Sequence, residues 1–211
     1  IMKKKILFIV FSFAILLVAC RPEPIPISGD ILFSDDFSTQ ENGWTRLINE
    51  GGLMGYDAAG FRFFIREEGV DYWTTPGLSL SNTRVEVDVL QYAGPVENRM
   101  GIICRHQNDQ NFYFFVISAD GYYAIGKNKD GRSTLLEQNA MQYSGAIKKG
   151  VVINHLRAEC QGSTLSFFVN DVPVALVVDE DFSSGDVGLL AGTFDRGDLD
   201  ILFDNFVVTQ P

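Results

Sequence analysis

Residues 100–127, MGIICRHQNDQNFYFFVISADGYYAIGK, contain three apolar runs that are separated by two short polar turns. The turns lie at 108–111 and 120–121, and their Asn, Asp and Gly residues are types that reverse the chain between neighbouring strands. The runs between them lie at 100–106, 112–118 and 122–127. This stretch therefore predicts three consecutive antiparallel strands.

The same pattern continues along most of the chain. Further strands are expected at 31–33, 60–66, 83–91, 152–160, 164–170, 172–178, 187–193 and 199–209. No segment has an apolar stripe of helical period. Many short strands separated by turn residues predict an all-β fold, a two-sheet antiparallel β-sandwich.

Two of these runs show how the strands should face the core. In 83–91, Val85, Val87 and Val89 alternate with Glu86 and Asp88, so the valines should face inward and the carboxylates outward. The run 112–117, FYFFVI, is apolar at every position. It predicts a central strand with one face in the core and the other lining a partly covered surface, where a groove could form.

Charge limits the class of ligand. The chain has 211 residues, 46% of them hydrophobic, and a formal net charge of −10. Such a field repels phosphate backbones and anionic lipid surfaces, so nucleic-acid binding is not expected. Neutral ligands such as sugars, and cations such as calcium, remain open.

The N-terminus has the pattern of an export signal. Lys3, Lys4 and Lys5 precede an apolar run at 6–17, which is too short for a comfortable transmembrane helix of about 20 residues. Residues 17–20, LVAC, resemble the bacterial lipobox, in which the cysteine is lipidated after cleavage. The resemblance implies a signal peptide at 1–19 and acylation of Cys20. An uncleaved signal anchor, or an ordinary signal with a chance cysteine, is the alternative.

The segment that follows reads as a tether. Residues 20–30 include RPEPIPISGD, which has three prolines and no hydrophobic period. One domain should then occupy 31–211. The expected location is a cell membrane or cell surface, with the membrane contacted through the lipid anchor alone.

Several motifs resemble the concanavalin A-like lectin/glucanase superfamily, and most closely its laminin-G-like and keto-disaccharide-hydrolase-like jelly rolls. They are GIICR at 101–105, NFYFF at 111–115, DGYYAI at 120–125, NHLRAECQG at 154–162, FVN at 168–170, GDVGL at 185–189 and LFDNFV at 202–207. The resemblance implies a jelly roll with a concave sheet where sugars often lie. It also implies that the first and last strands are neighbours. Activity does not follow, because this fold carries lectins, glycosidases and structural modules alike.

A catalytic interpretation begins from Glu86, Asp88 and Gln91, which resemble the catalytic strand of family-16 glycoside hydrolases. Retaining hydrolysis needs two carboxyl groups about 5–5.5 Å apart, one of them protonated. Gln91 stands where the acid is expected, and an amide cannot deliver a proton. We therefore interpret these residues as polar groups on the wet face of a strand, unless another strand supplies a carboxyl group.

Arg105 and Tyr113 are the first candidates for a ligand-binding face. Each is out of phase with apolar neighbours that should face the core, so each should point outward. A tyrosine ring accepts the CH face of a sugar, and arginine donates to its hydroxyls. A structural cation over a ring, or an ion pair with Glu86 or Asp88, is the alternative. Further candidates for the groove are Tyr72, Trp73, Tyr92 and Tyr123, whereas Trp44 is expected in the core.

The remaining cysteines, Cys104 and Cys160, fall in phase with inward positions. An exported chain can oxidise them to a disulfide, and two buried free thiols are the alternative. Asp36 and Asp204, with Asp35, could hold a calcium ion, which takes about six to eight oxygen ligands. Turn and capping roles for these aspartates remain equally open. His106 and His155 lack zinc-type spacing.

These observations predict a surface-anchored lipoprotein whose jelly roll binds carbohydrate or another extracellular ligand without catalysis. Arg105, Tyr113, Glu86, Asp88, Tyr92 and Tyr123 are the expected binding residues. A glycoside hydrolase-like enzyme and a structural or protein-interaction module of the cell envelope are the alternatives.

Overall fold

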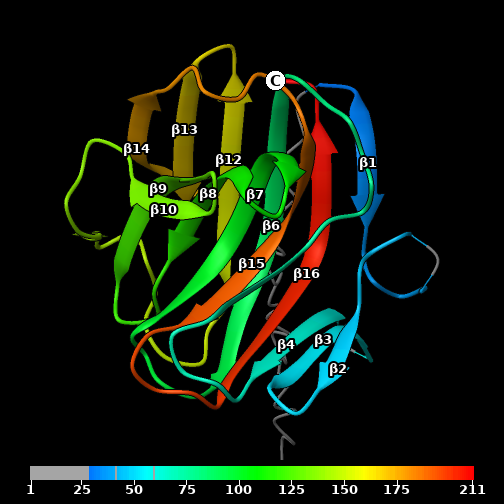
Figure 1. The fold of residues 1–211 in the computed structure, drawn as a ribbon, viewed down its shortest axis with the longest axis vertical. Helices are drawn as coiled ribbons and strands as arrows, with labels where there is room; N and C mark the ends of the chain where they lie inside the picture. Colours follow the sequence, from blue (N-terminus) through cyan, green and yellow to red (C-terminus); the bar gives the residue numbers. More distant parts are fainter. Residues whose placement is uncertain (1–28, 41, 59) are drawn as a thin grey trace, which may run out of the picture.

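The fold is taken from a computed structural model of the chain. The structure describes residues 29–40, 42–58 and 60–211, so the predicted signal peptide, Cys20 and most of the predicted tether lie outside the described residues. The described residues form sixteen strands and no helix, in two stacked sheets (Figure 1). Within them there is accordingly no helix long and apolar enough to cross a membrane.

The larger sheet has nine strands. Their bounds are β1 Ile31–Asp35, β2 Leu47–Asn49, β3 Gly52–Asp57, β4 Gly60–Ile65, β6 Thr83–Ala93, β12 Asn154–Gln161, β13 Thr164–Val169, β14 Val172–Val178 and β16 Leu199–Thr209. The order is β14-β13-β12-β6-β16-β4-β3-β2, and β1 also pairs with β16. Every pairing is antiparallel.

The smaller sheet has seven strands and lies in front of the larger one in Figure 1. Their bounds are β5 Asp71–Thr74, β7 Asn98–Asn108, β8 Asn111–Ile117, β9 Tyr122–Lys129, β10 Arg132–Leu135, β11 Gln142–Tyr143 and β15 Asp186–Thr193. The order is β10-β9-β8-β7-β15-β5, with β11 paired to β9. The predicted all-β, two-sheet antiparallel jelly roll is confirmed.

All the strands predicted from the sequence are present, and five were not predicted. Glycines 51, 52 and 55 dilute the apolar pattern of β2 and β3, and β5 has only four residues. The strand β10 is mostly polar and β11 has two residues. These short strands carry no alternation long enough to detect.

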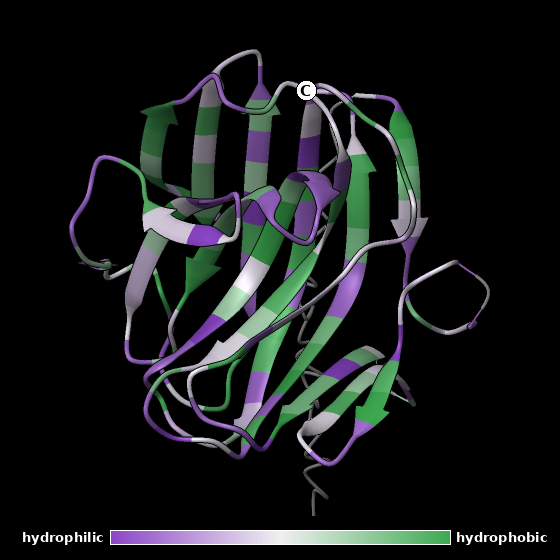
Figure 2. Cartoon of the chain, viewed as in Figure 1, coloured by the Kyte–Doolittle hydropathy of each residue, from purple (hydrophilic) through white to green (hydrophobic). Residues whose placement is uncertain are grey.

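The core lies between the two sheets and follows the predicted alternation. Val85, Val87 and Val89 of β6 are buried, while Glu86 and Asp88 alternate with them. Figure 2 shows the corresponding hydrophobic and hydrophilic bands along β6 and β12. The predicted core residue Trp44 is 4% exposed and donates its indole N–H to Asp35 at 2.8 Å.

The strand β8 buries apolar side chains on both faces, as predicted. Its inward set belongs to the main core, and its outward set forms a second apolar cluster on the outer face of the seven-stranded sheet. The inward set is Tyr113, Phe115 and Ile117; the outward set is Phe112, Phe114 and Val116. The outward cluster therefore provides the apolar surface of the candidate site.

The first and last strands are neighbours, as the family resemblance implied. In the β1–β16 ladder, Asp35 pairs with Phe206. Beyond that ladder, the N–H of Gln210 donates to the carbonyl oxygen of Asp30 at 3.0 Å. The two ends of the domain therefore lie side by side.

The predicted disulfide is present and crosses the core. It joins Cys104 of β7 to Cys160 of β12, with a Cα–Cα distance of 7.0 Å. Because β7 and β12 belong to different sheets, the bond links the two layers directly. The sequence separation of 56 residues makes it a constraint on a long loop of the unfolded chain.

Replacing both Cys104 and Cys160 by alanine is expected to lower the free energy of unfolding by about 4 kcal/mol, because the open chain regains loop entropy. Urea unfolding of the non-reduced wild type and of the double variant measures the difference. A variant that unfolds within about 0.5 kcal/mol of the wild type would contradict a structural role for the bond.

Candidate functional site

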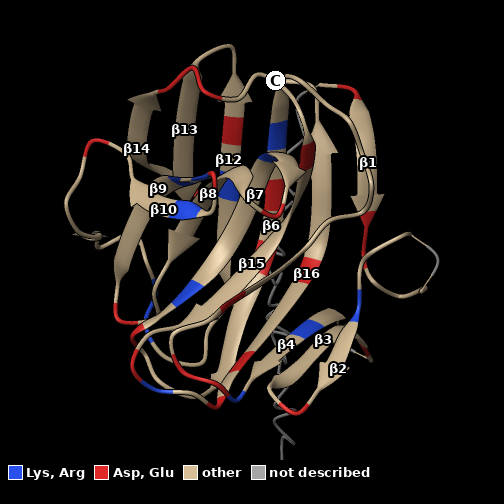
Figure 3. Cartoon of the chain, in the orientation of Figure 1, with Lys and Arg blue, Asp and Glu red and all other residues tan. Residues whose placement is uncertain are grey.

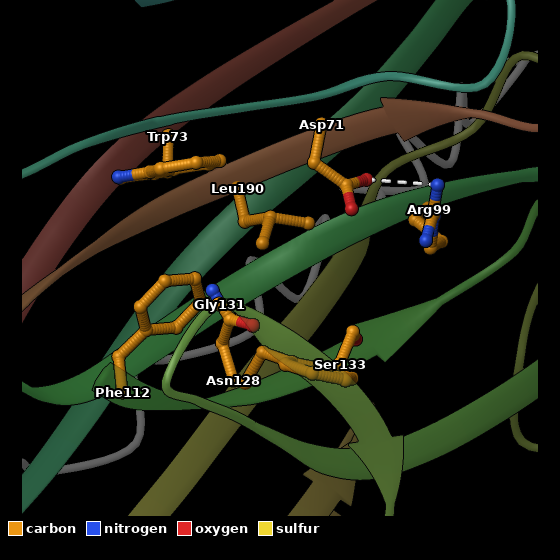
Figure 4. A pocket seen from close by; sticks show the side chains of 9 residues that line it. Asp71, Trp73, Arg99, Phe112, Asn128, Gly131, Ser133 and Leu190 are labelled. Carbon is orange, nitrogen blue, oxygen red and sulfur yellow. Dashed lines mark ion pairs between the residues drawn. The ribbon is translucent and has the colours of Figure 1, made fainter. Parts of the chain in front are cut away.

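A cavity of about 220 Å³ opens on the outer face of the seven-stranded sheet (Figure 4). We call it the face cavity. Strands β5, β7, β8, β9 and β15 contribute to its lining, together with the β9–β10 hairpin. The lining residues are Asp71, Trp73, Arg99, Phe112, Phe114, Asn128, Gly131, Ser133 and Leu190.

Aromatic and aliphatic side chains form one side of the face cavity. The ring centroids of Trp73 and Phe112 are 5.5 Å apart, and the rings are tilted at 44°. Leu190 pairs with Trp73 across the β15–β5 ladder. Such a surface can pack against the CH groups of a ligand.

A charged pair lies at the other side. The Asp71 carboxylate is 3.0 Å from the Arg99 Nη2 atom, and in Figure 4 both groups face the cavity. Arg99 Nη2 donates its aligned hydrogen bond to the carbonyl of Thr193 at 2.9 Å, and the guanidinium lies 4.6 Å from the Phe194 ring centroid. Asp71 Oδ1 is therefore close enough to Arg99 for an ion pair but accepts no hydrogen bond of good geometry. Burial raises the pKa of Asp71, and Arg99 offsets part of this effect.

Hydrogen bonds fix the turns around the cavity. Asn128 Nδ2 donates to the carbonyl of Asp109 at 3.1 Å, and the N–H of Gly131 donates to the carbonyl of Gln110 at 3.1 Å. The indole N–H of Trp73 donates to Asp109 Oδ1 at 3.3 Å. Both loops and the Trp73 ring are thus held before any ligand arrives, which lowers the entropic cost of binding.

The prediction that Arg105 faces outward is wrong. Arg105 is 2% exposed and its guanidinium donates to the carbonyl oxygens of Phe182 at 2.7 Å and Ser81 at 3.2 Å. A break in the β7–β8 register begins after Cys104, and Arg105 has a φ of 52°. Such a bulge interrupts the alternation and redirects the side chain. Burial lowers the pKa of Arg105.

Tyr113 and Tyr123 also face the core side of their sheet, contrary to the prediction. Tyr113 is fully buried, and its hydroxyl donates to Asp179 at 2.6 Å and accepts from the N–H of Phe182 at 3.1 Å. Tyr123 is partly buried against the same core. Because β8 is apolar on both faces, alternation alone could not tell the inward set from the outward set.

Glu86 and Asp88 face outward as predicted, but on the nine-stranded sheet. His155 lies between them, with Nε2 3.2 Å from Glu86 and Nδ1 2.9 Å from Asp88. Asn205 donates a further bond to Asp88 at 3.0 Å. Figure 3 shows acidic bands on β6, where Glu86 and Asp88 lie, and on the neighbouring strand β16. The larger sheet thus carries a charged outer surface, separate from the face cavity.

These contacts explain the pKa shifts in the cluster. Hydrogen bonds to Asp88 and Glu86 raise the pKa of His155 to about 9. The hydrogen bond from His155 lowers the pKa of Glu86. For Asp88, burial acts upward but is outweighed by hydrogen bonds from His155 and Asn205, so its pKa is also lowered.

The His155 cluster predicts a loss of stability at alkaline pH. Its folded-state pKa is above the unfolded value of 6.5, so the stabilisation is complete below pH 6.5 and is lost as pH rises through about 9. Solvent screens the partly exposed ring, so we expect a loss of about 1 kcal/mol. Urea unfolding from pH 6 to about pH 10 should show this loss in the wild type but not in His155→Gln. The same loss in His155→Gln would assign it elsewhere, and His106→Gln, the other histidine, should keep it.

The expected binding residue Tyr92, and Gln91, which stands where a catalytic acid would be expected, also lie on the nine-stranded sheet. Tyr92 is 45% exposed and lines a separate surface hollow with Arg62 and Asp200. Gln91 is 6% exposed and donates to the carbonyls of Ala93, Gly94 and Pro95. Its amide closes a turn and lies away from the face cavity.

The predicted calcium ligands have other roles. Asp36 accepts hydrogen bonds from the N–H and hydroxyl of Ser38, and Asp204 accepts from the N–H of Asn205. The Asp35 carboxylate accepts hydrogen bonds from the N–H of Phe37 and the indole N–H of Trp44. Among the described residues, no group of three or more acidic, histidine or cysteine side chains could hold a metal ion. The calcium site at Asp36 and Asp204 stays a prediction.

Of the residues proposed from the sequence, Trp73 lines the face cavity. Asp71, Arg99, Phe112 and Asn128 were not identified. The apolar outward face of 112–117 was the available signal, because it required a partly covered surface. Asp71 and Arg99 come from strands that only the fold brings together.

Two stacked antiparallel sheets define the class of this protein as a jelly-roll β-sandwich. The carbohydrate binding module CBM66 from Bacillus subtilis is similar in structure, with a TM-score of 0.65 and 21% identity, over 80% of this chain and 96% of that one. A Bacillus subtilis protein of unknown function with a galectin-like fold has a TM-score of 0.65 at 12% identity, over 86% of this chain and 96% of that one.

A third similar structure is a GH16 protein from Bacteroides ovatus in complex with a mixed-linkage glucan product. Its TM-score is 0.60 at 10% identity, over 84% of this chain and 100% of that one. No family model matches the chain. No curated protein matches it either. At these identities the likeness establishes the fold, and function has to be argued from the site.

Proposed function

We propose that the protein is a carbohydrate-binding jelly roll whose ligand lies in the face cavity. The observation that carries this proposal is the pairing of Trp73 and Phe112 with the Asp71–Arg99 pair across one open cavity. Sugars present apolar CH faces and hydroxyl groups together. An aromatic surface binds the first, and a carboxylate and guanidinium bind the second.

Asp71 is a suitable acceptor for sugar hydroxyls. Burial penalises its charged form, and the aligned hydrogen bond of Arg99 Nη2 goes to the carbonyl of Thr193. Asp71 Oδ1 is buried and paired with Arg99, so the other carboxylate oxygen, Oδ2, is the one that would accept a hydrogen bond from a sugar hydroxyl. The names of CBM66 and the mixed-linkage glucan complex agree with this class of ligand.

Binding is favoured over hydrolysis by the set of lining residues. Glycoside hydrolysis uses two carboxyl groups that flank the bond. Among the described residues that line the face cavity, Asp71 is the only carboxylate, and the nearby Asp109 carboxylate already accepts the indole N–H of Trp73. Glu86 and Asp88 pair with His155 on the other sheet.

The anchor is part of the proposal and rests on the sequence. Lipidation of Cys20 would hold the domain at a cell membrane or surface through the segment at 20–30. The exported location is compatible with the disulfide, since such bonds persist in oxidising compartments. The expected partner is an extracellular carbohydrate.

A glycan array with the purified full chain tests the function. We expect binding to a neutral glycan without product release, and about tenfold weaker binding by Asp71→Asn. The thermal midpoint of Asp71→Asn should not fall, because burial disfavours the native carboxylate. Cleaved product would favour the hydrolase alternative. Absence of any glycan signal would reject the proposal in favour of a protein-interaction module.

A further inference from the structure

A second cavity adjoins the face cavity at Trp73. This edge cavity, of about 280 Å³, shares Asp71 and Trp73 with the face cavity. Its other lining residues are Thr45, Arg46, Leu47, Met54, Tyr72 and Asp109. It lies where β5 ends the seven-stranded sheet and the β2–β3 segment of the other sheet approaches.

Hydrogen bonds hold Trp73 and its strand β5 in place. On one side the indole N–H of Trp73 donates to Asp109, and on the other the Thr74 hydroxyl donates to the carbonyl of Thr45 at 2.8 Å. The second bond ties the segment before β2 to β5. The aromatic side chain that lines both cavities is therefore held in a fixed position.

The volumes of the two cavities indicate that one ligand fills both. Ligand pockets in proteins usually have volumes of about 300–1,000 Å³. The face cavity and the edge cavity, at about 220 and 280 Å³, each fall below that range. Taken together they are within it. A ligand that fills a typical pocket would thus extend over Trp73 from one cavity to the other.

The lining of the edge cavity matches an uncharged polar ligand. Leu47 and Met54 supply apolar surface. Arg46 is exposed, and its Nη1 donates a hydrogen bond to Gln40 Oε1 at 3.0 Å. The Asp109 side chain is 83% exposed and can accept further hydrogen bonds. Across the two cavities Arg46 and Arg99 balance the carboxylates Asp71 and Asp109, so the combined lining has no net charge and suits an uncharged ligand.

We propose that the ligand is an uncharged oligosaccharide of at least two units, with adjacent units in the face cavity and the edge cavity and the second unit bound by Arg46. This inference rests on the proposed function and extends it. The face cavity alone would bind one unit weakly. The edge cavity adds affinity only when a second unit is covalently attached to the first.

The test is a titration series by Trp73 fluorescence and calorimetry, using gluco-, xylo-, galacto- and fructo-oligosaccharides from monosaccharide to tetrasaccharide. In the series that binds, the disaccharide should bind at least about tenfold more tightly than the monosaccharide. Arg46→Ala should remove most of that gain and leave monosaccharide affinity unchanged. Arg196→Ala, another exposed arginine, is the matched control and should keep the gain.

The outcomes separate the two proposals. If the monosaccharide binds as tightly as its oligomers and Arg46→Ala has no effect that depends on ligand length, the second subsite is rejected while the function stands. Tighter binding of oligogalacturonates than of neutral oligomers would reject the uncharged class. If no oligosaccharide or monosaccharide binds, the proposed function fails, and this inference fails with it.

Discussion

Trp73→Ala is expected to weaken glycan binding by about 2 kcal/mol or more, roughly thirtyfold, while the sandwich stays folded. Trp73 is the one side chain that is aromatic and lines both the face cavity and the edge cavity. Its removal takes away the stacking surface for either sugar unit. Titration of the variant with the best array ligand, together with its thermal midpoint, measures both effects.

The control is an exposed aromatic residue on the other sheet. Tyr92 is 45% exposed on the nine-stranded sheet, so Tyr92→Ala should bind like the wild type. If Tyr92→Ala loses binding and Trp73→Ala does not, the ligand lies on the larger sheet. That result would also restore Glu86 and Asp88 as candidate ligand contacts.

Arg105→Ala is expected to destabilise the domain by about 2–4 kcal/mol without changing the affinity of the folded fraction. Its buried guanidinium donates to the carbonyls of Phe182 and Ser81, which would be left without these donors. Urea unfolding gives the stability change. Calorimetry, corrected for the folded fraction, gives the affinity.

A matched comparison makes this result decisive. Arg196→Ala removes an exposed arginine and should change stability by less than about 0.5 kcal/mol. If Arg105→Ala were as stable as the wild type and lost its ligand, Arg105 would be a binding residue after all. Its interior position would then be incorrect.

The sequence predicted the layers well and the face of individual side chains less well. Alternation in β6 correctly placed Val85 and Glu86, because only one face of that strand is apolar. In β8 both faces are apolar, so the sequence pattern could not show which side chains face the core. The β7–β8 ladder decides it, since Cys104 lies opposite Tyr113 and both face inward.

The charged half of the candidate site, Asp71 and Arg99, was not predicted from the sequence either. Asp71 lies in a four-residue strand, and Arg99 lies 28 positions later in β7. They meet because β15 pairs with both β5 and β7. Hydrophobic periodicity describes one strand at a time, so it cannot predict that side chains from two different strands will lie close together. Arg105 was misplaced for another local reason, a bulge that alternation does not foresee.

The side-by-side position of residues 30 and 210 has an architectural consequence. A chain that enters and leaves a domain at one point can interrupt a host loop without stretching it. This jelly roll is therefore suited to transplantation: inserted into the surface loop of an unrelated protein, it would keep its own shape and present its cavity from the new scaffold.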